Sequence, residues 1–96
     1  MFVSIRRYRD APKGFCREVE VGFLPILLRQ PGFVAYYAVE GTDGAVTTVS
    51  VFSTAAMAED SDTLAADWLK SRPGPEIAPA EIAAGRLTIA VPTVRG

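Results

Sequence analysis

Four stretches of the chain carry hydrophobic and polar patterns of β-strands, and we expect strands at residues 2–9, 33–40, 45–53 and 86–94. In the first stretch Arg7 shares one face with the apolar Val3 and Ile5, whereas Arg6 lies on the opposite face. β-Branched and aromatic residues dominate the second and third stretches. The short loop between these two, residues 41–44 (Gly-Thr-Asp-Gly), predicts that they pair as an antiparallel hairpin. Pro92 fits only an edge or an end of the last strand.

Two further stretches place apolar residues at the spacing of a helix. The first, residues 15–30, has an apolar stripe made of Cys16, Val19, Phe23, Leu24, Leu27 and Leu28. Pro25 removes one backbone hydrogen bond inside it, so we expect a kink near residues 22–24 rather than two separate helices. The second, residues 54–71, has a cap at Ser53 or Thr54, and Met57, Ser61, Leu64, Ala65 and Trp68 share one of its faces. Three prolines then predict an extended connector over residues 73–84, with at most one short turn at residues 80–84.

The resulting order, β-α-β-β-α-β, is that of the ferredoxin-like fold. This is an α+β fold in which a four-stranded antiparallel sheet carries two helices on one face. We therefore expect residues 1–96 to form a single domain of this type. The other face of the sheet would be bare, and a second copy of the chain can cover it. The long connector could also carry the last strand across to that partner.

Missing residue types exclude much of the usual chemistry. The sequence has no His and no Asn, which removes Ser-His-Asp and Cys-His catalysis, His metal sites and His-ligated haem. The carboxylates of Glu59, Asp60 and Asp62 fan out over a wide arc of their helix, so we expect no metal site. Cys16 is the single cysteine, which excludes an intrachain disulfide and favours a reducing compartment.

Charge and hydropathy limit the kinds of binding partner that the chain can have. The 10 basic and 11 acidic side chains give a net charge near −1, so we expect no nucleic-acid partner. No apolar run approaches the roughly 18–20 residues of a membrane span, and we expect a cytoplasmic protein without a membrane partner. The mean hydropathy of +0.20 is high for a small monomer, and together with a bare sheet face it favours a homodimer.

Four residues are candidates for a functional site, and each also has a purely structural interpretation. Arg7 is expected at the mouth of a pocket, where its guanidinium could bind a phenolate or carboxylate; otherwise it is a solvated strand end. Tyr36 and Tyr37 point to opposite faces of the sheet, and either could bind a substrate or belong to the core or the interface. Trp68 could form the aromatic wall of a small apolar pocket between the helices and the sheet, or anchor the core.

Residues 2–8 (Phe-Val-Ser-Ile-Arg-Arg-Tyr), 31–37 (Pro-Gly-Phe-Val-Ala-Tyr-Tyr), 49–52 (Val-Ser-Val-Phe) and 64–68 (Leu-Ala-Ala-Asp-Trp) together resemble a known family. It is the antibiotic biosynthesis monooxygenase-like family of dimeric α/β-barrel proteins. The resemblance implies a homodimer. For some members it also implies a cofactor-independent monooxygenase that oxidises polyketide-type aromatic molecules with O₂.

On this resemblance Arg7 is the candidate catalytic residue, Tyr36, Tyr37 and Trp68 are candidate substrate-binding residues, and no cofactor is expected. A second branch of the family degrades haem and needs an Asn on the first strand and a His on the iron. Arg7 stands at the position of that Asn and the chain has no His, so we do not expect haem degradation. The absence of His and Asn favours an alternative, a non-catalytic dimeric small-molecule-binding or structural protein of the same fold.

Overall fold

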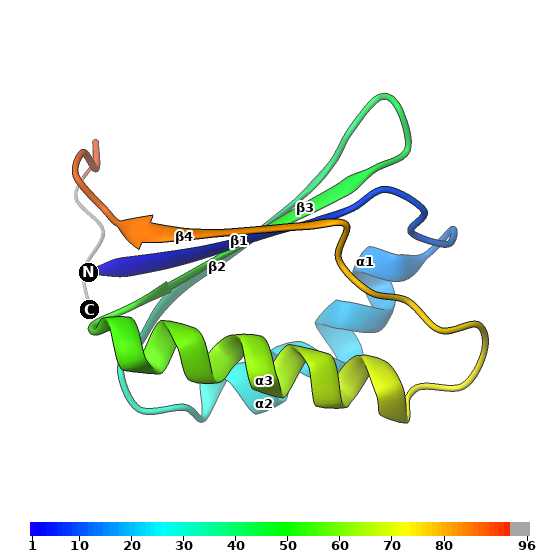
Figure 1. Cartoon of the computed structure of the whole chain (residues 1–96), viewed down its shortest axis with the longest axis horizontal. Helices are drawn as coiled ribbons and strands as arrows, with labels where there is room; N and C mark the ends of the chain where they lie inside the picture. Colours follow the sequence, from blue (N-terminus) through cyan, green and yellow to red (C-terminus); the bar gives the residue numbers. More distant parts are fainter. Residues whose placement is uncertain (93–96) are drawn as a thin grey trace.

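A computed structural model describes residues 1–92 of the chain as a sheet with one layer of helices (Figure 1). The sheet has four antiparallel strands in the order β2-β3-β1-β4. The elements in chain order are β1 (Phe2–Tyr8), α1 (Phe15–Glu18), a π-helical segment η1 (Val19–Phe23), α2 (Leu24–Leu28), β2 (Phe33–Glu40), β3 (Val46–Phe52), α3 (Ala55–Ser71) and β4 (Glu81–Arg86). This is the predicted ferredoxin-like α+β fold, with all helices on one face of the sheet.

The first helical region, Phe15–Leu28, is irregular at the position where a kink was predicted. α1, η1 and α2 run on without a gap from Phe15 to Leu28, and the middle part is a π-helix. Pro25 lies in the first turn of α2, where the missing backbone N–H costs least. Immediately before it, the Leu24 backbone N–H donates to the Val19 carbonyl five residues back, as in a π-helix. The region ends at Leu28, because the residues that follow turn through Gln30-Pro31-Gly32 into β2.

The last strand was predicted at the wrong position. The sequence pattern placed the last strand at residues 86–94 and the connector at residues 73–84, whereas β4 spans Glu81–Arg86. The reason is the length of its partner, because Glu81 pairs with Arg7 and Arg86 pairs with Phe2, at the start of β1. Within residues 87–92, only the Leu87 backbone N–H finds a backbone partner, the carbonyl of Met1. Residues 93 and 94 of the predicted strand lie outside the described part of the chain.

The core lies between the sheet and the helices. Its buried apolar members include Phe15, Phe23 and Leu27 from the first helical region, and Phe52 from β3. α3 begins at the predicted cap, since Thr54 Oγ1 accepts a hydrogen bond from the Met57 backbone N–H. No helix within residues 1–92 combines the length and apolar character needed to cross a membrane.

Candidate functional site

Strand register assigns each candidate residue to one face of the sheet. On β1, Ser4 and Arg6 are buried beneath the helices, and this side is called the inner face. Val3, Ile5 and Arg7 point the other way, onto the open face. Residues opposite each other in a pair of strands share a face, so the register extends this division across the whole sheet. The open face then carries three rows: Gly85-Val3-Val51-Ala35, Ala83-Ile5-Val49-Tyr37 and Glu81-Arg7-Thr47-Val39.

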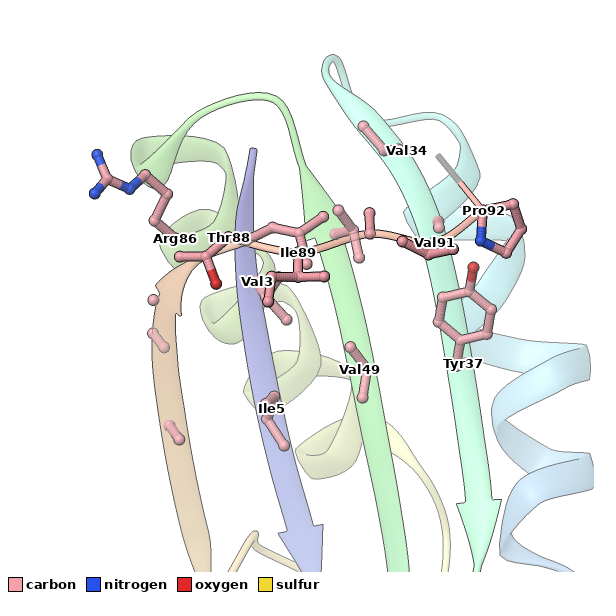
Figure 2. A pocket seen from close by; sticks show the side chains of 17 residues that line it. Val3, Ile5, Val34, Tyr37, Val49, Arg86, Thr88, Ile89, Val91 and Pro92 are labelled. Atoms are coloured by element: carbon pink, nitrogen blue, oxygen red, sulfur yellow. The ribbon is translucent and has the colours of Figure 1, made fainter. Parts of the chain in front are cut away.

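The open face holds a cavity of about 940 Å³. Its floor comes from the two apolar rows of all four strands, including Val3, Ile5, Val49 and Tyr37 (Figure 2). Its roof is residues 87–92, here called the C-terminal segment, which crosses over β1 and β3 toward β2. Tyr37 reaches the far end of the cavity beside Val91 and Pro92. The arrangement can enclose an apolar molecule and offer it one phenolic hydroxyl.

The C-terminal segment covers this cavity loosely. Ile89 and Val91 are 80% and 90% exposed, the highest values among the large apolar side chains of residues 1–92. An apolar side chain that packed well onto the sheet would lose most of that exposure. The open face therefore keeps unburied apolar surface both on the sheet and on the segment above it.

Arg7 lies on the open face, one row beyond the apolar floor, and it does not line the cavity. It is half-exposed and donates a hydrogen bond of 3.1 Å to Asp43 in the hairpin loop. The Ala45 backbone N–H and, to a lesser degree, Arg7 lower the pKa of Asp43 below its usual value. The Arg7 guanidinium is therefore paired with Asp43, outside the lining of the cavity.

Tyr36 and Trp68 lie on the inner face, away from Arg7 and Tyr37. The Phe23 ring stands between them, with ring centroids 6.5 Å from Tyr36 and 5.7 Å from Trp68. Gly22 also meets Trp68, because a Cβ at Gly22 would come within 2.9 Å of the indole Nε1. Trp68 lines neither the open-face cavity nor a smaller one of about 340 Å³ beside Cys16.

The four candidates thus form two separate pairs, and the expected single pocket between helices and sheet is not where the large cavity lies. Tyr36 and Tyr37 do point to opposite faces, as the strand pattern predicted. The aromatic rings of Phe23 and Trp68 occupy the space in which the pocket was expected. The large cavity is on the opposite side, where the C-terminal segment covers the strands.

A polar cluster on the inner face was missed by sequence reasoning. We call it the inner polar band, and it consists of Ser4, Arg6, Thr48 and Ser50 from the sheet with Ser61 and Asp62 from α3. Arg6 is only 2% exposed. Its Nη1 donates to Asp62 Oδ1 at 3.0 Å and to the Ser61 carbonyl at 3.2 Å, and its Nη2 donates to Ser50 Oγ at 2.8 Å. The sequence signal was present, since polar residues alternate with apolar ones on both β1 and β3.

Burial is the main cause of the pKa shifts of the two tyrosines beside the inner polar band. Burial raises the pKa of Tyr36, whereas the Thr48 hydroxyl and the Arg6 guanidinium act in the opposite direction. Burial likewise raises the pKa of Tyr8, and Arg6 again opposes it. At the smaller cavity, burial and the nearby Glu40 carboxylate raise the pKa of Cys16, so its thiol is a weak nucleophile at neutral pH.

Within residues 1–92 no three His, Cys, Asp or Glu side chains come close enough together to hold a metal ion. Glu59 and Asp60 are exposed on α3. Asp62 differs from them because it turns inward to Arg6 and to Ser4, whose hydroxyl donates to it at 2.5 Å. One of these three carboxylates, that of Asp62, therefore belongs to the inner polar band.

Comparison with known proteins identifies the fold. No family model and no curated protein matches the sequence. Among solved structures, a variant of MhuD crystallised with two manganese protoporphyrin IX molecules per active site is similar, with a TM-score of 0.64 and 18% identity over 94% of this chain and 97% of that one. The protein Atu4242 from Agrobacterium tumefaciens is similar with a TM-score of 0.58 and 22% identity over 92% of this chain and 94% of that one. At such identities the likeness establishes the ferredoxin-like fold alone.

Proposed function

We propose that the chain is a homodimeric member of the antibiotic biosynthesis monooxygenase-like family that binds a small aromatic or polyketide-type molecule. The observation that supports this proposal is the cavity of about 940 Å³ on the open face, with its apolar floor and loose roof. Its size falls within the range that holds small organic ligands. Tyr37, the one aromatic residue of the lining within residues 1–92, supplies a hydroxyl that can orient an oxygen-bearing ring.

A second copy of the chain is the partner that this face suits. The sheet has helices on one side only, and Ile5, Tyr37, Val39, Ile89 and Val91 remain exposed on the other. Burial of apolar surface is the main favourable term in association, and two like sheets can pack face to face. In such a dimer the cavity becomes an enclosed space between subunits, from which water is excluded.

The ligand is proposed to be metal-free. The MhuD variant among the similar structures was crystallised with a manganese porphyrin. This chain has no His to hold a porphyrin metal, and Cys16 lies outside the lining of the large cavity. An aromatic molecule held by apolar contacts and one hydrogen bond requires neither.

Monooxygenase-like chemistry is the second candidate, and the position of Arg7 favours it. Arg7 stands one row from the cavity floor on the same face as Tyr37. A permanently charged guanidinium there can stabilise the anion formed when an activated aromatic substrate loses a proton. The anionic carbon would then bond to O₂, which is the oxidant, and take back the proton as a hydroperoxide. Loss of water from the hydroperoxide leaves one oxygen atom on the ring as a carbonyl, so that no cofactor is required. Arg7 remains our proposed catalytic residue for this step.

Both candidates are tested by one set of measurements on the purified protein. Light scattering at micromolar concentration is expected to report a dimer. Titration with an anthrone or a hydroxynaphthoquinone is expected to show saturable binding, and hemin is expected to give no specific shift of its Soret band. Oxygen uptake with the same aromatic compounds then separates the candidates, because a binding protein consumes none. If uptake occurs, Arg7→Ala is expected to slow it.

Val49→Arg is the matched variant, because it places a charge in the centre of the cavity floor. It is expected to abolish both dimer formation and ligand binding while the monomer stays folded. A wild-type protein that remains a folded monomer of about 10 kDa would contradict the dimer. Ligand binding that survives Val49→Arg would contradict the proposed position of the ligand.

A further inference from the structure

The smaller cavity, of about 340 Å³, lies between two loops of the chain. One wall comes from residues 11–16, which form the turn after β1 and the start of α1. The other wall comes from the hairpin that joins β2 to β3, at residues 40, 41, 44 and 46. Within residues 1–92 this lining shares no residue with the cavity on the open face and includes none of the four candidate residues.

Backbone hydrogen bonds within each loop fix the two walls. In the hairpin, the Gly41 N–H donates to the Ala45 carbonyl at 2.7 Å, and the Gly44 N–H donates to the Gly41 carbonyl at 3.0 Å. In the opposite wall, the Phe15 N–H donates to the Pro12 carbonyl at 3.0 Å. The cavity is therefore formed without a guest, as most sites for small molecules are.

Small residues in the lining leave this space unfilled. Gly14 and Gly44 both have positive φ angles, and a Cβ at either position would meet no atom of another segment of residues 1–92 within 4 Å. Phe15 and Val46 are 2% and 5% exposed, and they give the cavity an apolar base. A volume of about 340 Å³ is near the lower limit for small-molecule sites, so a guest must be small.

Glu40 brings a carboxylate to the cavity at the end of β2. Its row of the sheet contains Val46 and Tyr8, both buried, whereas Glu40 itself is exposed. Burial and, after it, the Glu40 carboxylate raise the pKa of Cys16, which places this carboxylate close to α1. None of the ion pairs formed within residues 1–92 includes Glu40. The carboxylate can therefore accept hydrogen bonds from a cationic guest.

Lys13 brings the opposite charge to the same cavity. It lies in the turn after β1, and in the described part of the chain it too forms no ion pair. The ammonium of Lys13 and the carboxylate of Glu40 thus line one cavity without bonding to each other. A molecule that carries both a carboxylate and an ammonium can pair with both groups. The apolar base favours an aliphatic side chain on that molecule.

We propose that this cavity binds a free aliphatic α-amino acid, with its carboxylate at Lys13 and its ammonium at Glu40. Charge pairs at an exposed rim each contribute little, so the affinity depends on both pairs and on the apolar base together. All groups of the site come from one chain and none lines the open-face cavity. The site is therefore independent of the proposed dimer and of its aromatic ligand, and either proposal can fail alone.

The test is an NMR titration of the isotope-labelled full chain with L-leucine. The backbone amide signals of Gly14, Gly41 and Gly44 are expected to shift with saturation. Lys13→Gln and Glu40→Gln each remove one exposed charge and leave the core intact, and each is expected to weaken binding about fivefold. Isocaproate, which lacks the ammonium of leucine, and isoamylamine, which lacks its carboxylate, are expected to bind the wild type similarly weakly.

Lys70→Gln and Glu59→Gln are the matched controls, because both residues are exposed on α3 and lie outside the lining of this cavity. Both variants are expected to bind leucine like the wild type. Equal affinity for leucine in the wild type and in Glu40→Gln would overturn the proposal. Isocaproate that binds as tightly as leucine would also overturn it, because the site would then recognise an anion alone. Glycine signals that do not shift would mean that the cavity holds water only.

Discussion

Arg6 and Arg7 are adjacent in sequence but have opposite environments. Arg6 is buried and held by three hydrogen bonds, whereas Arg7 is half-exposed and bonded to a loop carboxylate. Alternation along β1 predicts that they differ, but it does not say which face the helices cover. The sequence favours Arg7 as the functional residue, because its neighbours on the same face of the strand, Val3 and Ile5, are apolar. Packing of α3 onto the other face is a tertiary effect, and it places Arg6 in the interior.

Alkaline pH is expected to destabilise the protein through its buried tyrosines. Burial raises the pKa of Tyr8 and Tyr36 in the folded chain, and both side chains titrate at about 10 when it is unfolded. The folded state therefore keeps protons that the unfolded state loses. The stability is complete below about pH 10 and falls as the pH rises through the folded-state values. Urea unfolding at pH 8, 10 and 11 measures the loss.

Tyr36→Phe isolates the share of one side chain in this pH dependence. The variant removes a partly buried titrating group, so its stability is expected to fall less steeply between pH 10 and 11 than that of the wild type. The absolute stability at pH 8 serves as the baseline for each protein. An identical slope in both proteins would show that Tyr36 does not carry the effect.

At the scale of elements, the π-helical segment η1 lies where the first helical region packs against α3. Gly22 lies within η1, and the Trp68 indole packs directly on it. Gly22→Ala would normally favour a helix by about 1 kcal/mol. Here the added Cβ would lie 2.9 Å from Trp68 Nε1 and 3.1 Å from Cζ2, so overpacking is expected to cost about 1–3 kcal/mol. The midpoint of urea unfolding measures the change.

A double-mutant cycle identifies Trp68 as the cause of that cost. In a Trp68→Leu background the bulky indole is gone, and Gly22→Ala is expected to be neutral or stabilising. If Gly22→Ala costs the same in both backgrounds, the strain does not come from Trp68, and the close approach has no energetic role.

Most helices and strands were predictable, because the spacing of apolar residues and the turn residues determine structure over short segments of sequence. The hairpin of β2 and β3, the capped α3 and the irregularity at Pro25 follow from short segments of sequence. β4 was misplaced because its position depends on β1, a distant partner whose first residue limits the pairing. Residues 87–91 alternate in the manner of a strand, yet β1 begins at Phe2, and within residues 87–92 it is Leu87 whose backbone N–H bonds next to it, to the Met1 carbonyl. The four candidate residues lie on two faces of the sheet for a similar reason, because local sequence patterns do not show which face of the sheet the helices cover.

On the scale of the whole molecule, the two faces of the sheet have different roles. The inner face is closed by helices and carries the inner polar band, whereas the open face carries apolar rows and a loosely packed C-terminal segment. A chain of this length buries only about 60–65% of its unfolded surface and has little stability to spare. Cover for the open face by a second copy would therefore stabilise the fold itself.

Ile89 provides the test of that coupling. It is 80% exposed in the single chain, so Ile89→Asp is expected to change monomer stability by no more than about 0.5 kcal/mol. In the proposed dimer the same change buries a charge. The dissociation constant of the dimer, measured by sedimentation, is therefore expected to rise at least tenfold. It is also expected to flatten the rise of Tm with protein concentration that a dimer requires.

Leu28→Asp is the matched control for Ile89→Asp, since Leu28 is 57% exposed but lies on α2, in the helical layer away from the open face. It is expected to leave association unchanged, because the proposed interface does not include that layer. An effect of Leu28→Asp equal to that of Ile89→Asp would place the interface on the helices. A Tm that is independent of concentration in the wild type would mean that the open face stays uncovered and that one chain is stable alone.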